Sequence, residues 1–145
     1  MIIDTTLVFS DQQLVTVSAP SINTIDLGAT GTPFAATNPL VRDIGRGDRL
    51  DLSVSVSQVF AGLTSLQVSV QTSPDNVSWT SVDTGAPIAA ASLAAGYLFR
   101  VPNLVQNAPA RYLRLYYSVV GTATQGAISA AIVASRQTNI ASGAI

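Results

Sequence analysis

Hydrophobic and polar residues alternate along several stretches of this chain, and that alternation is the main clue to its fold. From position 50 to 57 every second residue is Leu or Val, and the residues between them are Asp or Ser. A period of two recurs from 66 to 71 and from 113 to 119. Successive side chains of a strand point to opposite faces, so each stretch predicts a strand with one face on a core and one toward solvent.

Turn-forming residues separate these stretches. Residues 72–76 read Thr-Ser-Pro-Asp-Asn and residues 77–82 resemble a returning strand, so 66–82 predicts a β-hairpin. Further strands are expected at 7–9, 14–17 and 128–132, and turns at Ala61-Gly62 and between Gly121 and Gly126. We expect loops at 28–38 and 84–96, the second with one helical turn within 89–95.

The stretch from Leu115 to Ser135 carries no charge and has to be considered as a membrane span. Its apolar residues alternate with small polar ones, whereas a spanning helix needs about 20 predominantly apolar residues. Two strands around a turn at 121–126 fit this pattern better.

About eight short strands in one chain of 145 residues indicate a single all-β domain. We expect an antiparallel two-sheet β-sandwich of jelly-roll type over residues 1–145, with terminal arms at about 1–6 and 136–145. The predicted core residues are the apolar members of the strands, namely Leu52, Val54, Leu66, Val68, Val70, Trp79, Leu113, Leu115 and Ile132.

The charge content narrows the choice of partners. Charged residues make up 10% of the chain, against about 25% in ordinary soluble domains, and the net charge is −1. This charge balance gives no electrostatic reason to bind nucleic acid or an anionic membrane. So few charges suggest a surface that other proteins cover, although a plain Ser/Thr-rich β domain would look similar. The start Met1-Ile2-Ile3-Asp4 is unlike a signal peptide, and the lack of cysteine fits synthesis in a reducing cytoplasm.

Most catalytic side chains are missing from the sequence. It has no His, Cys or Lys, which removes Ser-His-Asp triads, thiol nucleophiles, Schiff-base lysines and phosphate-binding loops. Zinc would have to rely on aspartates alone, so no metal or other cofactor is expected. Asp48 and Asp51 could form a carboxylate pair, but their place at a strand entrance favours solvated side chains. We therefore predict that the protein is not an enzyme.

Seven residues are candidate contacts with a partner protein or with other copies of the chain. Tyr112, Arg114 and Tyr116 share one face of a predicted strand, and Tyr and Arg are enriched in interfaces. The alternative is that a loop covers this face. The other four candidates are Arg42 and Arg46 before the strand at 50, and Ile140 and Ile145 in the C-terminal arm. Arg46-Gly47-Asp48 matches an adhesion tripeptide, but it also reads well as a loop.

Two resemblances bear on function. The hairpin over 67–82 and the later Ala110-Arg111-Tyr112-Leu113-Arg114-Leu115 resemble the discoidin-type galactose-binding jelly roll. This resemblance implies a carbohydrate-binding module as an alternative function.

The second resemblance covers nearly the whole chain. Residues 1–11, 63–73 and 111–124 together are similar to the small capsid cement, or decoration, proteins of tailed bacteriophages, of the type found on a Bordetella phage. The resemblance implies a jelly-roll protein on the outer surface of the virion that ties major capsid protein subunits together. With it we expect dimers or trimers of the chain, synthesis in the host bacterial cytoplasm, and no direct contact with nucleic acid or membrane.

Overall fold

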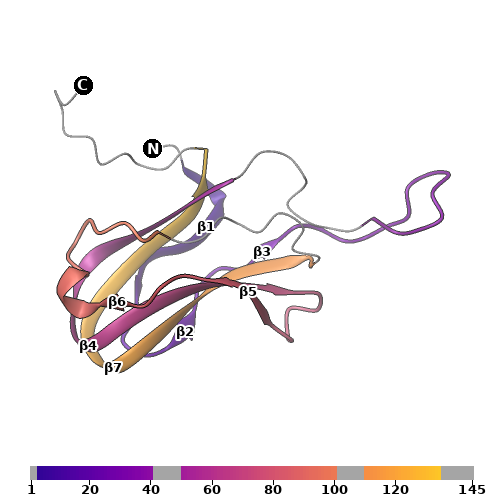
Figure 1. The fold of residues 1–145 in the computed structure, drawn as a ribbon. Coiled ribbons are helices and arrows are strands. Elements are labelled where there is room, and N and C mark those ends of the chain that lie inside the picture. The colour runs from indigo at the N-terminus through magenta and orange to yellow at the C-terminus, as the bar shows by residue number, and fades with distance from the viewer. Residues whose placement is uncertain (1–2, 41–49, 101–109, 135–145) are drawn as a thin grey trace.

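The structure is a computed structural model that describes residues 3–40, 50–100 and 110–134 (Figure 1). Within these ranges the chain forms seven strands and one turn of 3-10 helix. The strands are β1 (Ile3–Leu14), β2 (Ala19–Pro20), β3 (Ile25–Asp26), β4 (Asp51–Ser73), β5 (Thr80–Thr84), β6 (Ile88–Ala89) and β7 (Tyr112–Val133), and the 3-10 turn is η1 (Ala90–Ser92). The described residues contain no helix long and apolar enough to cross a membrane.

The described strands form one antiparallel sheet built on β4 and β7. These two strands pair along their whole lengths, from Asp51 opposite Val133 to Ser73 opposite Tyr112. The sheet order is β1-β7-β4-β5, with β2 and β3 also on β7 and β6 also on β4. The all-β, antiparallel prediction is confirmed, but the strands belong to one hydrogen-bonded sheet where two separate sheets were expected.

Both expected mid-chain turns are wrong, because β4 and β7 continue through them. The register between the strands shifts repeatedly between Val56 and Ser65, so the extra residues form bulges within paired strands. Gly62 and Gly121 have φ of +85° and +91° there. A Cβ on Gly62 would lie 2.5 Å from the carbonyl oxygen of Thr122. Glycine at these positions permits a bulge and a bend rather than a chain reversal.

The bend divides the sheet into two parts. The terminal half contains β1 with residues 51–58 of β4 and 127–133 of β7, and the hairpin half contains residues 63–73 and 112–120 with β2, β3, β5 and β6. Figure 1 shows β4 and β7 curving together so that the halves lie over each other. Ser10 of the terminal half is 2.7 Å, hydroxyl to hydroxyl, from Tyr117 of the hairpin half, in the buried space between them.

The core lies between the two halves and follows the predicted alternation. Eight of the nine predicted core residues are buried, among them Leu52 and Leu115, which expose nothing. Trp79 is the exception, since its side chain is only half-buried. It precedes β5, where the chain has just left the hairpin turn. Burial raises the pKa of Tyr117, which is therefore held as a neutral phenol in the core.

The hairpin is confirmed, with strands that end and restart later than expected: Thr72 pairs with Thr80. Its turn is organised by Asp75, whose carboxylate accepts hydrogen bonds from the Val77 and Ser78 amides at 2.9 and 2.7 Å. These bonds lower the pKa of Asp75. The helical turn expected within 89–95 is present as η1.

The chain after η1 covers the open edge of β4 in the terminal half. The amide of Phe60 donates to Leu93, and that of Val56 donates to Tyr97, at 3.1 and 2.9 Å. The Phe99 amide donates to Val54 at 2.9 Å. Residues 93–99 therefore act as an additional edge segment that protects β4 from pairing with other chains.

Candidate interaction surfaces

The three residues selected on β7 form an ordered outer face on the hairpin half. Leu113, Leu115 and Tyr117 point into the core, so Tyr112, Arg114 and Tyr116 lie on the opposite side, where each is half-buried. Their neighbours across the β4 pairing are Ser73, Gln71 and Ser69. We call Tyr112, Arg114, Tyr116 and the adjacent Trp79 the aromatic–arginine face.

Arg114 is held in place by two contacts. Its Nε donates to Oε1 of Gln71 at 2.8 Å, and its guanidinium carbon lies 4.0 Å from the centre of the Trp79 ring. Cation–π contact of this kind fixes both side chains. Partial burial lowers the pKa of Arg114, but an arginine guanidinium remains charged in proteins. The sequence did not predict this contact, because it joins Arg114 of β7 to a residue before β5 that is distant in the sequence.

An ion pair lies next to this face. Arg111 donates through Nε and Nη2 to the two carboxylate oxygens of Asp26, at 2.6 and 2.7 Å. The Arg111 guanidinium also lies 4.9 Å from the centre of the Tyr112 ring. Hydrogen bonds from Arg111 and from the Gly28 amide lower the pKa of Asp26 from 3.8 to about 2. This pair fixes β3 against the start of β7.

The other four candidate contacts cannot be placed. Arg42 and Arg46 fall in the segment 41–49, and Ile140 and Ile145 fall in 135–145, all outside the described residues. The predicted C-terminal arm at 136–145 lies outside them too. Of the N-terminal arm at 1–6, residues 3–6 form the start of β1.

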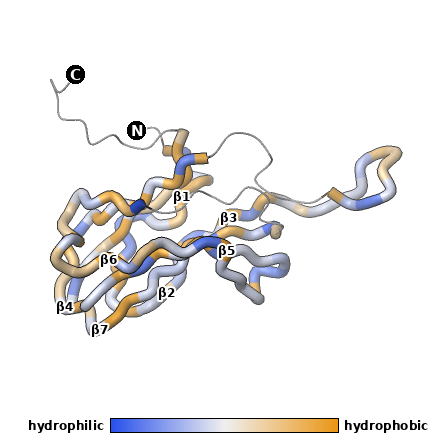
Figure 2. The backbone as a smooth tube through the Cα atoms, in the orientation of Figure 1, coloured by the Kyte–Doolittle hydropathy of each residue, from blue (hydrophilic) through white to orange (hydrophobic). Residues whose placement is uncertain are grey.

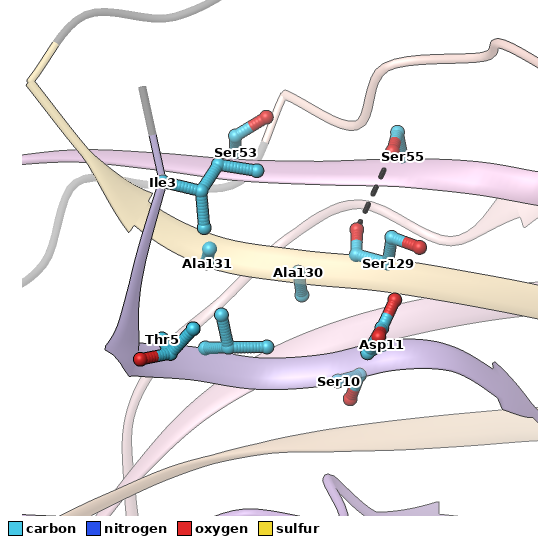
Figure 3. A pocket seen from close by; sticks show the side chains of 10 residues that line it. Ile3, Thr5, Ser10, Asp11, Ser53, Ser55, Ser129, Ala130 and Ala131 are labelled. Atoms are coloured by element: carbon cyan, nitrogen blue, oxygen red, sulfur yellow. Dashed lines mark hydrogen bonds between the residues drawn. The ribbon is translucent and has the colours of Figure 1, made fainter. Parts of the chain in front are cut away.

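A second surface feature is a hollow on the outer face of the terminal half. It has a volume of about 310 Å³ and a mostly apolar lining. Figure 3 shows Ile3 and Thr5 at one end of it and Asp11, Ser55 and Ser129 toward the other. The remaining lining residues are Val8, Ser10, Ser53, Ala130 and Ala131.

Two properties of the sequence produce this hollow. Between Ile3 opposite Val133 and Val8 opposite Ala131, β1 advances five residues while β7 advances two, so β1 bulges away from its neighbour. Asp4 stabilises the bulge by accepting hydrogen bonds from the Thr6 amide and hydroxyl at 2.8 and 2.6 Å. The strands beneath carry only Ser and Ala toward this side, and these short side chains leave the space unfilled.

A third feature is the segment 28–40, which we call the finger. It leaves β3 and projects from the body of the domain, as the purple loop at the right of Figure 1. Two backbone hydrogen bonds close it, from the Leu40 amide to Gly31 at 2.8 Å and from the Ala36 amide to Pro33 at 3.0 Å. Phe34 at its tip is fully exposed, with a relative accessibility of 103%. Figure 2 shows hydrophobic positions on this projection, away from the core.

The sequence predicted a loop at 28–38 but did not identify the finger or the hollow as surfaces. A signal for the finger was present, because Phe34 is a large apolar residue in a segment with no strand alternation. No signal marks the hollow, which depends on how β1 pairs with β7. No cluster of acidic side chains suited to a metal ion occurs among the described residues.

Comparison with known proteins agrees with one of the resemblances seen in the sequence. No curated protein matches the chain. The sequence profile of one family, Bbp16, matches residues 9–132, which covers every described strand except the first half of β1 and the last residue of β7. The chain therefore belongs to the Bbp16 family, a family of Bordetella phage proteins.

Proposed function

We propose that the chain is a capsid cement protein, which binds the outside of a tailed-phage head and bridges major capsid protein subunits. Membership of a phage family gives the setting for this proposal. The observation that carries it is the aromatic–arginine face, in which Arg114 is already held between Gln71 and Trp79.

That face has the properties of a protein-binding surface. Tyr, Trp and Arg dominate the energetics of many interfaces. Ordering a long side chain on binding usually costs about 0.5–1.5 kcal/mol, and a side chain that is ordered beforehand avoids most of this cost. The face also lies on β7, which is paired on both sides, so the surface keeps its shape under load.

The proposed mechanism requires binding but no chemical reaction, and we propose no enzymatic activity. A protein that binds the assembled shell and not free subunits stabilises the shell by mass action. Many copies on one head act together, so weak individual contacts give a strong total effect against the pressure of packed DNA. A net charge of −1 offers no attraction to the DNA itself or to an anionic membrane.

The proposal includes further points about structure and location. We place the protein on the outer surface of the virion, after synthesis in the bacterial cytoplasm, with the major capsid protein and copies of itself as partners. We also propose that the folded sheet is a variant of the jelly-roll sandwich in which β4 and β7 each belong to both layers. The stacking of the two halves across one core supports this view.

Co-sedimentation of the purified protein with empty phage heads tests the function. We expect saturable binding, and at least a tenfold weaker affinity for Arg114→Ala, as for other central interface arginines. Arg100→Ala is the matched control, since Arg100 is exposed and belongs to neither β7 nor its neighbours. Failure of the unmodified protein to bind heads would overturn the cement function. Equal binding by Arg114→Ala would instead remove the aromatic–arginine face from the contact.

The carbohydrate-binding alternative is less well supported. Sugar sites in proteins commonly use an aromatic ring with a free face, but the Trp79 ring is already in contact with Arg114. A glycan array probed with the same protein tests this alternative, and specific binding there without binding to heads would favour it.

A further inference from the structure

We propose that the finger of one copy of this chain inserts Phe34 into the hollow of a second copy. The contact would join the tip of residues 28–40 to the outer face of β1, β4 and β7. It concerns self-association, so it does not depend on the proposed binding to heads.

The finger is built to present an apolar side chain. Phe34 is fully exposed, more so than any other large apolar residue that the structure describes. The hydrogen bonds from Ala36 to Pro33 and from Leu40 to Gly31 hold the tip. Ala35 has a φ of +62°, a backbone conformation that is uncommon for residues other than glycine. An ordered loop with an exposed phenyl ring loses little conformational entropy on binding.

The hollow matches that ring in size and chemistry. A cavity of about 150 Å³ is enough to bind benzene, so about 310 Å³ has room for the Phe34 ring and part of Pro33. Its lining is mostly apolar, and the small side chains beneath allow a ring to approach the backbone of β7.

Charge is compatible with the same pairing. The finger contains no charged residue from 28 to 40, and the hollow has one, Asp11, at its margin. Insertion of the finger would therefore bury no unpaired charge, provided that Asp11 stays at the rim. A charged or strongly polar partner would use neither feature.

The finger does not fill the hollow of its own chain. A second copy is the partner that carries the complementary feature for each. Phe34 is fully exposed here. The finger leaves the hairpin half, whereas the hollow belongs to the terminal half (Figures 1 and 3). A donor and an acceptor on different parts of one molecule can join copies either reciprocally in a dimer or head to tail in a ring.

Sedimentation velocity over a concentration series tests the contact with the isolated full chain. We expect Phe34→Ala to weaken self-association roughly 10- to 100-fold, the effect of losing one buried phenyl group. Ser129→Trp should do the same by filling the hollow from its floor. Thr5→Trp fills it from an exposed position and serves as a second blocking variant. Val77→Ala, which alters an exposed apolar residue elsewhere, should leave association unchanged.

A mixing experiment separates this contact from any other interface. The Phe34→Ala protein keeps its hollow and the Ser129→Trp or Thr5→Trp protein keeps its finger. At a concentration where each variant alone stays monomeric, an equimolar mixture should therefore associate. Circular dichroism and the melting temperature check that each variant is folded. A monomeric unmodified protein, undiminished association of Phe34→Ala, or a mixture of folded variants that stays monomeric would each overturn the inference.

Discussion

Gly126 gives the sharpest test of how the bent sheet is packed. It lies at the bulged part of β7, between positions that pair with Gln58 and Ala61, and its φ is +142°. A Cβ at this position would overlap the ring of Phe60, with Cδ1 as the nearest ring atom, followed by Cε1 and Cγ. That ring is buried and cannot rotate away without displacing its neighbours.

We therefore expect Gly126→Ala to destabilise the fold through two separate effects. A non-glycine residue in a disfavoured backbone conformation costs about 1–3 kcal/mol. Forcing a buried ring to move costs about 1–3 kcal/mol more. The sum, about 2–6 kcal/mol, is a large part of the roughly 5–15 kcal/mol that keeps a domain folded.

Gly96 provides the matched control. Its φ is +87°, but nothing lies within 4 Å of a Cβ built there, so Gly96→Ala carries the backbone effect alone. Urea unfolding followed by circular dichroism measures both variants. Adding Phe60→Leu to Gly126→Ala should relieve part of the overlap, so the two changes should not be additive. Equal stability losses at positions 96 and 126, or strict additivity with Phe60→Leu, would refute the packing argument.

Three further predictions concern the core, the ion pair and the C-terminus. Leu115→Ala should lower the free energy of unfolding by about 2–5 kcal/mol in urea, because Leu115 exposes nothing; a loss below 1 kcal/mol would contradict its place in the core. The lowered pKa of Asp26 means that its contribution to stability is present above pH 3.8 and is lost as the pH falls toward about 2. Asp26→Asn should thus reduce the fall in melting temperature over that range, and an unchanged acid profile would argue against the pair with Arg111. Deleting residues 138–145, a segment of mostly small residues, should leave the melting temperature nearly unchanged and weaken attachment to heads; the reverse pattern would make the segment part of the fold.

The alternation of residue types identified most of the strands and most of the core, but the strand expected at 14–17 is wrong, because β1 ends at Leu14. Val54 and Leu113, for example, are buried as their strand positions predict. Trp79 was misplaced because hydrophobicity alone does not distinguish a core position from a partner for a surface arginine. Its actual contact, Arg114, is set by the pairing of β4 with β5 and β7.

The predictions of turns at Gly62 and between Gly121 and Gly126 were wrong for a related reason. A glycine with positive φ suits a chain reversal and a bulge equally well, so Gly62 and Gly121 do not reveal which one occurs. The deciding factor is that the two regions pair with each other, with Leu63 opposite Gly121. Such long-range pairing cannot be read from a local pattern, and for the same reason the hollow was not foreseen.

The continuity of β4 and β7 through both halves also bears on how the protein yields to stress. Two separate sheets could come apart and leave each one intact, but here each half shares both of its central strands with the other. Opening one half would break the β4–β7 ladder in mid-strand and expose the common core. We therefore expect amides in both halves to exchange with solvent at similar rates, through global unfolding and not through local opening. A domain built in this way is expected to stay fully folded under stress until it unfolds as a whole.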